Sequence, residues 1–265
     1  MANISSLAYV HPEARLADDV RVEAFAYIDK NVEIGPGCVI MSHASVIGGT
    51  TIGPGTKIYD GAVIGADPQD FRWKGEKGRC VIGSDTKIYQ HVIINRSIHD
   101  GASTTVGDNS YIMAQSHIGH DSHVGNYCVL GNGVKIAGDC HIDNYSILSS
   151  GVIVHEKCHI GEWTLIKGGC RVNNNVPPYC IMAHNPIAYF GVNAYLLRKG
   201  HMNEDRIDDI AKCYRHIYQC GTSLFNAMRR IQEDVTPTEE RDNILSFIRD
   251  HGMQIAAVPK DIYDY

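Results

Sequence analysis

An apolar residue stands at nearly every sixth position over most of the chain. From Val10 to Val172, 25 of the 28 positions in this series hold Ile, Leu or Val, and the exceptions are Asp70, Glu76 and Asp100. A period of six fits neither an α-helix, which repeats every 3.6 residues, nor a strand that alternates every second residue. It is typical of a parallel β-helix, in which each hexapeptide forms one flat side and a corner, so that about 18 residues complete a coil.

Small residues follow the apolar series in a second regular row. The fourth residue after each apolar one is usually small, and glycine often follows the apolar residue directly. We expect the apolar side chain to fill the interior, the small residue to fill the corner beside it, and glycine to tolerate the corner backbone. Five cysteines occupy the small position, which favours small buried residues over redox or metal groups: Cys38, Cys128, Cys140, Cys158 and Cys170.

The period of six stops after Val172, and the chain then changes character. From about Asn203, apolar residues recur at steps of three and four, which is typical of α-helices. A capping box with proline at the first helical position, Thr236-Pro237-Thr238-Glu239, predicts the start of the last helix. The sequence therefore predicts an all-β parallel β-helix over residues 1–190 and a small α-helical domain over residues 191–265.

Composition narrows the class of protein. The 265 residues carry a net charge of -6, which disfavours a general nucleic-acid binder. No apolar run approaches the ~18 residues of a membrane span, and the N-terminus lacks the pattern of a secretory signal. Nine cysteines without a CxxC pair, in a chain without an export signal, predict reduced thiols and a cytoplasmic location.

Histidines supply the sharpest candidate chemistry. In the segment His117-Ile118-Gly119-His120-Asp121, Ile118 belongs to the apolar series, so both histidines are expected to point outward. A histidine that is oriented by a carboxylate can act as a general base. His155, followed by Glu156, is expected near the same corner two coils later.

A second set of histidines is spaced by one coil. His123, His141 and His159 follow one another at this interval and should stack in a row on one face. Such a row suggests a metal, but a straight row fits tetrahedral coordination poorly. We therefore favour a solvated or interface row over a metal site.

Two segments, 67–79 and 99–105, interrupt the repeat with polar and charged residues. Insertions into a solenoid form loops on one face, which is often the binding face. The larger segment is either a solvated loop or a loop that grips phosphate groups. The chain has neither the GxxxxGK(S/T) motif nor a nucleophile elbow, which argues against a phosphate-loop NTPase and a serine hydrolase.

Four segments together carry a resemblance to a known family. They are GADPQDFRWKGE at 65–76, HIGHD at 117–121, the exit turn NNNVPPY at 173–179 and FGVN at 190–193. With the hexapeptide run and the C-terminal helices, the chain resembles the UDP-N-acetylglucosamine O-acyltransferases, cytoplasmic enzymes that begin lipid A biosynthesis. The resemblance implies a left-handed β-helix and a homotrimer with active sites between subunits.

The same resemblance implies a reaction and roles for individual residues. The donor would be a 3-hydroxyacyl group on acyl carrier protein, and the acceptor the glucosamine 3-hydroxyl of UDP-N-acetylglucosamine. His120 would be the general base, Asp121 would orient it, and the Gly138 N–H would hold the oxyanion, with no acyl-enzyme, cofactor or metal. Substrate contacts would come from a further set of residues: Asp70, Arg72, His117, His155, Glu156, Asn193, Arg198 and Lys199.

Three of the positions depart from the family's common pattern. Arg72 stands where the family commonly has Lys, Asp139 where it has His, and Glu156 where it has Gln. The arginine keeps the charge but changes its geometry. A substrate contact at position 139 is thereby put in doubt.

Other functions stay open at this stage. One is acyl transfer to a 3-amino sugar, and another is an acetyl-CoA-dependent transferase, against which the loop and the long helical domain argue. A trimeric zinc enzyme of the hexapeptide carbonic anhydrase type would use three histidines, but a C-terminal helical domain is not expected there. A scaffold without catalysis would not account for His120-Asp121 beside two interruptions.

Overall fold

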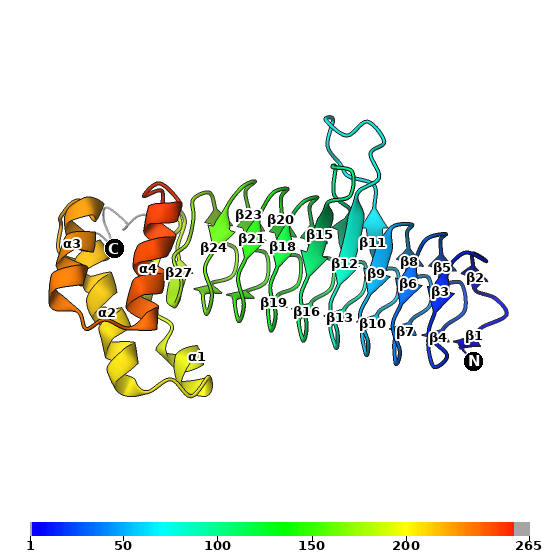
Figure 1. The fold of residues 1–265 in the computed structure, drawn as a ribbon, viewed down its shortest axis with the longest axis horizontal. Coiled ribbons are helices and arrows are strands. Elements are labelled where there is room, and N and C mark those ends of the chain that lie inside the picture. The colour runs from blue at the N-terminus through cyan, green and yellow to red at the C-terminus, as the bar shows by residue number, and fades with distance from the viewer. Residues whose placement is uncertain (1, 257–265) are drawn as a thin grey trace.

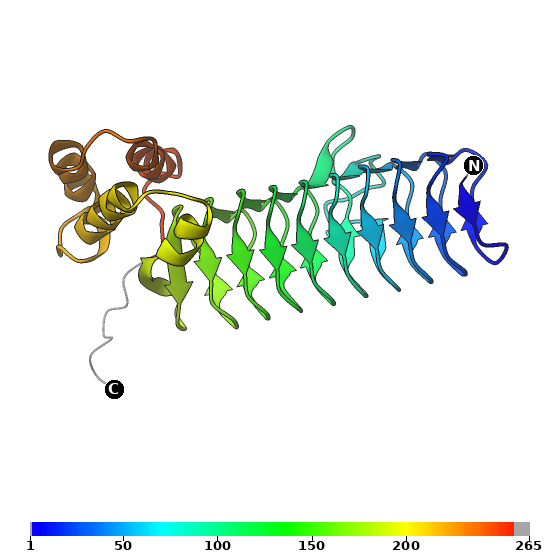
Figure 2. The same ribbon diagram turned by 90° about the horizontal axis from the view of Figure 1, so that it is seen from below.

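Short parallel strands build a long prism, and helices close one of its ends. The computed structural model describes residues 2–256, and Figure 1 shows the prism with the helical group at the end opposite the N-terminus. Three sheets form the sides of the prism, and the turned view in Figure 2 shows the strands of one side in a row. The predicted fold is confirmed: three parallel sheets typical of a left-handed β-helix are followed by four helices.

Each coil contributes one strand to each sheet. The first sheet contains β1 (Asn3–Ile4), β4 (Arg21–Val22), β7 (Val39–Ile40), β10 (Lys57–Ile58), β13 (Lys87–Ile88), β16 (Tyr111–Ile112), β19 (Val129–Leu130), β22 (Ile147–Leu148), β25 (Leu165–Ile166), β27 (Cys180–Ala183) and β28 (Ala188–Val192). The second contains β2 (Tyr9–Val10), β5 (Tyr27–Ile28), β8 (Ser45–Val46), β11 (Val63–Ala66), β14 (Ile93–Asn95), β17 (His117–Ile118), β20 (Lys135–Ile136), β23 (Ile153–Val154) and β26 (Arg171–Val172). The third contains β3 (Arg15–Leu16), β6 (Glu33–Ile34), β9 (Thr50–Ile52), β12 (Arg79–Ile82), β15 (Ser103–Val106), β18 (His123–Val124), β21 (His141–Ile142) and β24 (His159–Ile160).

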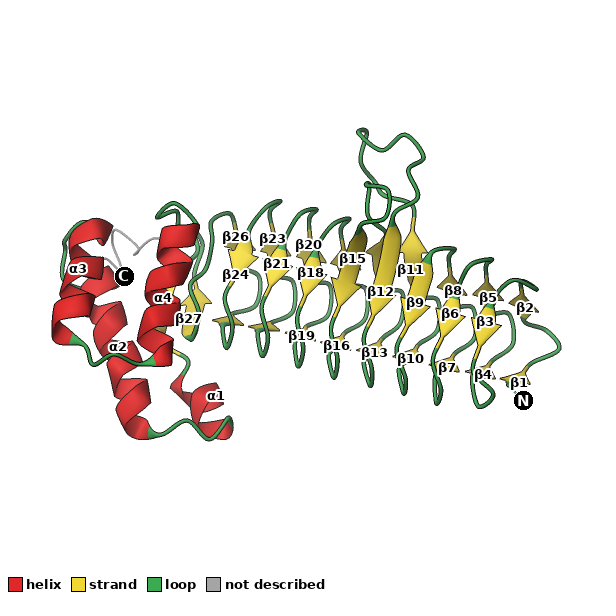
Figure 3. Cartoon of the chain, in the orientation of Figure 1, coloured by secondary structure: helices red, strands yellow, loops and turns green. Residues whose placement is uncertain are grey.

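The strand register locates the two insertions. Most partners are separated by one coil of the expected length, as in the pairing of Val124 with Ile142. Ile58 instead pairs with Ile88, and Ile88 with Ile112, so the chain makes two longer coils there. The extra residues leave the prism between the second and third sheets as the loops that protrude in Figure 3. They include all three non-apolar members of the series. The period of six keeps its phase because the two coils exceed the ordinary length by 12 and 6 residues, both multiples of six.

Corner glycines serve a different purpose from the one expected. Residues with φ near +60° stand three positions after the inward residue, and most of them are not glycine, for example Asp121, Tyr127 and Asp139. Apart from Gly65, with φ 77°, the glycines directly after the inward residue have no such φ. A Cβ on Gly119 would lie 2.7 Å from the carbonyl carbon of Ala137 in the next coil. These glycines permit close stacking of coils, so the expectation that they relieve the corner torsion was wrong.

The small position is buried at nearly every corner. Its hydroxyl and thiol groups reach carbonyls of the following coil: the Ser116 Oγ donates to Gly131 O at 3.0 Å, and the Cys128 Sγ to Asp143 O at 3.2 Å. Burial raises the pKa of the Cys128 and Cys140 thiols to about 12. All five cysteines of this row are buried and free, which confirms their interpretation as small interior residues.

Four helices follow the hairpin of β27 and β28. They are α1 (Ala194–Lys199), α2 (Glu204–Tyr218), α3 (Leu224–Asp234) and α4 (Glu239–Asp250). The cap of α4 is Thr238, whose Oγ1 accepts from the Arg241 N–H at 3.2 Å. The expected box beginning at Thr236 was therefore wrong by two residues, and Pro237 precedes the cap.

The division expected between residues 190 and 191 falls within β28 and stays a prediction. Tyr214 of α2 lies fully buried and donates from its hydroxyl to the carbonyl of Pro178, so the helices pack on the last coil. Within residues 2–256, no helix has both the length and the apolar character of a membrane span.

Candidate active site

His120 and Asp121 occupy the corner between β17 and β18. Asp121 is the corner residue with left-handed backbone, at φ 57°. That conformation turns its carboxylate back toward the preceding ring, and the His120 Nδ1 lies 2.8 Å from the Asp121 Oδ2. Although His120 points outward as expected, it is 6% exposed. The 67–79 loop lies over it.

Asp121 is held from three sides. Its two carboxylate oxygens accept from the Ser97 Oγ and from the Ile98 N–H, the latter at 3.1 Å. Its own N–H donates to the Thr104 Oγ1 at 2.8 Å. Burial by itself would raise the pKa of Asp121, but the hydrogen bonds from Ser97, Ile98 and His120 outweigh burial and lower it. Asp121 is therefore an anion in a fixed position, suited to orient a histidine.

The other ring nitrogen of His120 faces the loop. Its Nε2 lies 3.2 Å from the Asp70 Oδ2. Arg72 binds the same carboxylate through its Nε at 3.0 and 3.1 Å, its Nη2 at 2.8 Å and its backbone N–H at 2.7 Å. Hydrogen bonds from the Arg72 side chain are the main cause that lowers the pKa of Asp70.

Gly138 lies against the His120 ring from the next coil. A Cβ at position 138 would stand 2.5 Å from the His120 Cε1 and Nε2, so glycine is required for this approach. No acceptor within residues 2–256 takes the Gly138 N–H. The neighbouring Asp139 lies 3.9 Å from the Arg72 Nη2. His120, Asp121 and Asp139 also place ligand atoms within 4.8 Å of one another, but two of the three are already bonded together.

The arrangement combines the parts that acyl transfer needs. One nitrogen of His120 is fixed by a carboxylate, the other faces the outer surface under a loop, and a backbone N–H without an acceptor in the described residues stands beside it. A histidine oriented in this way can remove a proton, and a backbone N–H can stabilise a developing oxyanion.

Three further predicted residues surround this cluster more loosely. His117 is half-buried on β17, and burial followed by the Lys135 charge lowers its pKa, which favours a neutral ring at pH 7. His155 and Glu156 are exposed after β23. Glu156 acts electrostatically on Arg72 and adds to the causes that raise the pKa of the guanidinium.

The remaining three predicted residues lie at the helical end and make local contacts. Asn193 is 1% exposed, and its Nδ2 donates to the Trp163 carbonyl at 2.8 Å. Arg198 pairs with Glu204 at 2.7 and 2.8 Å, and the Lys199 Nζ lies over the Tyr195 ring. Within the part of the chain that the structure describes, none of the three contacts the His120 cluster. Their roles in nucleotide and diphosphate binding stay predictions.

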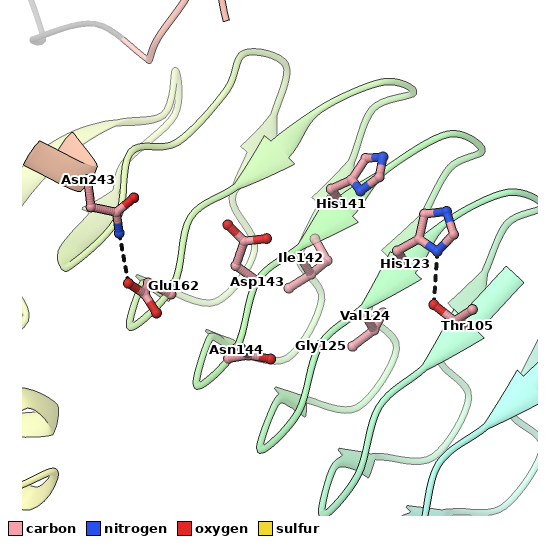
Figure 4. Close-up of a pocket in the computed structure, with 10 residues that line it drawn as sticks. All are labelled: Thr105, His123, Val124, Gly125, His141, Ile142, Asp143, Asn144, Glu162 and Asn243. Atoms are coloured by element: carbon pink, nitrogen blue, oxygen red, sulfur yellow. Dashed lines mark hydrogen bonds between the residues drawn. The ribbon is translucent and has the colours of Figure 1, made fainter. Parts of the chain in front are cut away.

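The predicted histidine row is present on the third sheet. Ring centroids of His123, His141 and His159 are 4.9 and 5.4 Å apart. Figure 4 shows the groove that two of them line, with His123 bonded to Thr105 and with a Glu162–Asn243 hydrogen bond at its far end. His159 uses both nitrogens, toward Asp143 and His251, each at 2.8 Å. The third ring thus helps to attach the segment after α4 to the prism.

Sequence reasoning missed the residues that hold Asp121. Ser97 lies just before the second interruption and Thr104 lies within it. The sequence predicts a binding face there but assigns no role to either residue. Each contact joins neighbouring coils. The insertion lengthens the spacing to 24 residues for Ser97, whereas Thr104 lies 17 residues from Asp121 across a coil of ordinary register. A rule of constant coil length therefore could not identify Ser97.

Three family models match parts of the chain. Residues 175–255 match the second domain of UDP N-acetylglucosamine O-acyltransferase, and residues 103–138 match the bacterial transferase hexapeptide model. Residues 4–99 match the GMPPB C-terminal domain.

Relatives with high similarity extend over nearly the whole chain. The acyl-carrier-protein–UDP-N-acetylglucosamine O-acyltransferase of Syntrophobacter fumaroxidans is 36% identical over 92% of this chain and 96% of its own length. The enzyme of that name from Chlamydia pneumoniae is 41% identical over 93% of this chain and 88% of its own. The crystal structure of LpxA, a UDP-N-acetylglucosamine acyltransferase from Bacteroides fragilis, superposes with a TM-score of 0.93 at 39% identity, covering 97% of this chain and 100% of that one.

Proposed function

Because the chain belongs to the UDP-N-acetylglucosamine O-acyltransferase family, we propose that it transfers a 3-hydroxyacyl chain from acyl carrier protein to the glucosamine 3-hydroxyl of UDP-N-acetylglucosamine. This is the first step of lipid A biosynthesis, and we place it in the cytoplasm. The nine free cysteines are consistent with a reducing compartment. The observation that carries the proposal is the His120 ring, fixed by Asp121 and covered by the 67–79 loop.

The mechanism is direct transfer. His120 takes the proton of the acceptor hydroxyl as its oxygen attacks the thioester carbonyl, and the Gly138 N–H stabilises the oxyanion. The C–S bond then breaks, and the imidazolium returns the proton to the leaving pantetheine thiolate. The Cys140 thiol of the adjacent coil is buried, and its Sγ donates to the His155 carbonyl at 3.1 Å. This thiol is therefore poorly placed to carry the acyl group, which supports transfer without an acyl-enzyme.

A homotrimer would complete the site. Within one chain, the contacts of Asn193, Arg198 and Lys199 do not reach the His120 cluster in the described residues. Sites shared between subunits would bring such residues of one subunit to the His120 corner of another. We expect light scattering of the purified protein to give three times the mass of the 29.2 kDa chain.

An acyl-transfer assay tests the proposal. Purified protein is incubated with UDP-N-acetylglucosamine and a panel of 3-hydroxyacyl carrier proteins, with acetyl-CoA as the alternative donor and a 3-amino analogue as the alternative acceptor. His120→Ala should lose at least ~100-fold in turnover, the usual contribution of a general base. The matched control is His141→Ala, which removes an exposed histidine of the third sheet and should keep turnover.

The possible results of this assay distinguish the proposed reaction and mechanism from their alternatives. Transfer by the wild type and by His141→Ala, together with loss in His120→Ala, supports the base assignment. Wild-type turnover in folded His120→Ala would overturn the mechanism. No transfer from any donor would overturn the acceptor assignment, and transfer to the amine alone would replace it. Zinc analysis of the same protein would test the metalloenzyme alternative.

A further inference from the structure

The two carboxylate oxygens of Asp121 are held by different groups. The Oδ2 lies 2.8 Å from the His120 Nδ1 and accepts from the Ile98 N–H at 3.1 Å, whereas the Oδ1 accepts from the Ser97 Oγ. Within residues 2–256, no other donor reaches the Oδ1. The terminal torsion of an aspartate side chain is broad, so a carboxylate that is held through one oxygen can turn. The Ser97 hydroxyl therefore fixes the plane of the Asp121 carboxylate.

The single hydroxyl proton of Ser97 is directed toward Asp121. A serine hydroxyl donates one hydrogen bond and can accept others. The Ser97 Oγ accepts from the His99 N–H at 2.9 Å, and two acceptors compete for its proton, the Asp121 carboxylate and the His99 carbonyl at 3.4 Å. The ionised acceptor forms the stronger bond. Because Ser97 is 0% exposed, solvent does not take the proton either.

Ser97 itself has a fixed place in the fold. Its N–H donates at 3.2 Å to the carbonyl of Arg79, the first residue of β12. The next residue, Ile98, binds the other oxygen of Asp121, so one short segment before the second interruption holds both oxygens. A Cβ on Gly78 would lie 2.9 Å from the Ser97 Cβ, so the chain packs closely around this serine. The segment is therefore a rigid support for the carboxylate.

The position of Asp121 affects the reaction through His120. Burial raises the pKa of Asp121, and the hydrogen bond from Ser97 is the largest of the causes that lower it. A carboxylate that stays ionised and in plane keeps the Nδ1 proton on its own side of the ring, so the Nε2 lone pair is available to the acceptor hydroxyl. A carboxylate that turns loosens the ring, and the Nε2 then meets the hydroxyl in a less productive geometry.

We infer that Ser97 is a positioning residue for acyl transfer: its hydroxyl holds the Asp121 carboxylate in the plane in which that carboxylate orients the His120 ring. The inference rests on the proposed function, and it adds a third member to the pair of His120 and Asp121. Ser97 is fully buried and, in the part of the chain that the structure describes, forms no hydrogen bond with His120. Its effect therefore has to pass through Asp121.

Steady-state kinetics of Ser97→Ala test this role. Loss of a hydrogen bond to a charged group should lower kcat about tenfold. The KM for UDP-N-acetylglucosamine should change by less than about twofold, because Ser97 does not face the substrate. Ser146→Ala is the matched control, since it removes an equally buried hydroxyl, which donates to the Gly161 carbonyl at 2.9 Å in a corner without residues of the proposed site. This variant should keep the wild-type kcat per folded molecule.

A second background separates positioning from a general structural defect. Asp121→Ala removes the carboxylate on which Ser97 acts, so the addition of Ser97→Ala should change the residual kcat by less than about twofold. An equal loss in both backgrounds would mean that Ser97 acts elsewhere, and the inference would be wrong. Wild-type kcat in folded Ser97→Ala would overturn it directly. If Ser97→Ala does not fold, Ser97→Cys carries the same test, because a thiol donates only weakly.

The tautomer of His120 tests the inference without any substrate. Long-range ¹H–¹⁵N spectra distinguish Nδ1–H from Nε2–H, with His120→Ala assigning the signals, at about pH 9, above the range in which histidines usually titrate. We expect the Nδ1–H tautomer in the wild type and in Ser146→Ala, and a mixture of both tautomers in Ser97→Ala. If the wild type transfers no acyl chain from any donor, the proposed function is wrong. An unchanged tautomer in Ser97→Ala would refute the role of Ser97 on its own.

Discussion

Gly138→Ala should disable the site without removing any of its functional groups. The added Cβ would stand 2.5 Å from the His120 Cε1 and Nε2. The φ of Gly138 lies outside the left-handed region, so alanine meets no torsional obstacle there. The backbone N–H at position 138 also remains. The substitution therefore acts on the position of the His120 ring alone.

The contact distance sets the size of the effect. Non-bonded carbon atoms pack at about 3.5–4.0 Å, so the ring has to retreat by about 1 Å. A shift of that size is enough to break its 2.8 Å bond to Asp121. Misplacement of a catalytic group by about 1 Å can cost 100-fold in rate, which corresponds to ~2.7 kcal/mol in the barrier. Overpacking should also lower the free energy of unfolding by about 1–3 kcal/mol.

Steady-state kinetics with UDP-N-acetylglucosamine and an active 3-hydroxyacyl carrier protein provide the assay. We expect kcat of Gly138→Ala to fall about 100-fold, with a smaller change in KM. Gly107→Ala is the control, because its Cβ would meet the carbonyl carbon of Gly125 at 2.7 Å in a coil corner that holds no catalytic group. A folded Gly138→Ala with wild-type kcat would refute the reasoning, and so would an equal loss per folded molecule in Gly107→Ala.

Two further predictions concern the stability of the prism. Burial raises the pKa of Glu162 above 4.5, so the folded protein loses stability as the pH rises from 4.5 toward 7. Glu162→Gln still accepts hydrogen bonds from Tyr179 and Asn243, and it should lose less stability between pH 4.5 and pH 7 in denaturant titrations. An unchanged loss of stability would contradict this prediction. Cys128→Ser should lower the free energy of unfolding by about 1 kcal/mol or less, because Ser116 makes the same corner hydrogen bond. Cys128→Leu should lower it by about 1–3 kcal/mol through overpacking. Thermal melts that rank the two variants in the opposite order would argue against the requirement for a small residue at the corner.

Periodicity predicted the prism because the β-helix repeats one local rule. Every coil places an apolar side chain inward and a small one in the corner, so the pattern can be seen in any stretch as long as one coil. The corner torsion could not be predicted in the same way. Residues as different as Asp121, Tyr127 and Lys157 adopt a φ near +60° there, because stacking of the coils imposes a conformation that their side chains do not favour.

The site was predictable where its residues are neighbours in sequence. His120 and Asp121 are adjacent, and their contact follows from the corner geometry. The contact of His120 with Asp70 joins positions that are distant in sequence and depends on how the 67–79 loop folds back over a later coil. The period of six says that a loop leaves the prism, but it contains no information on the direction in which the loop lies.

The three positions at which the resemblance leads us to expect other residues, 72, 139 and 156, are related in the structure. Arg72 lies 3.9 Å from Asp139, and Asp139 and Glu156 both add to the causes that raise the pKa of its guanidinium. Without the charge of Arg72, Asp139 and Glu156 would add repulsion to the ionised carboxylate of Asp70. Arginine suits this place better than lysine, because its planar group holds Asp70 through two nitrogens and still faces Asp139. A change at any one of these positions therefore alters the electrostatic surroundings of the other two, and they should be substituted together when their effect on the acceptor is measured.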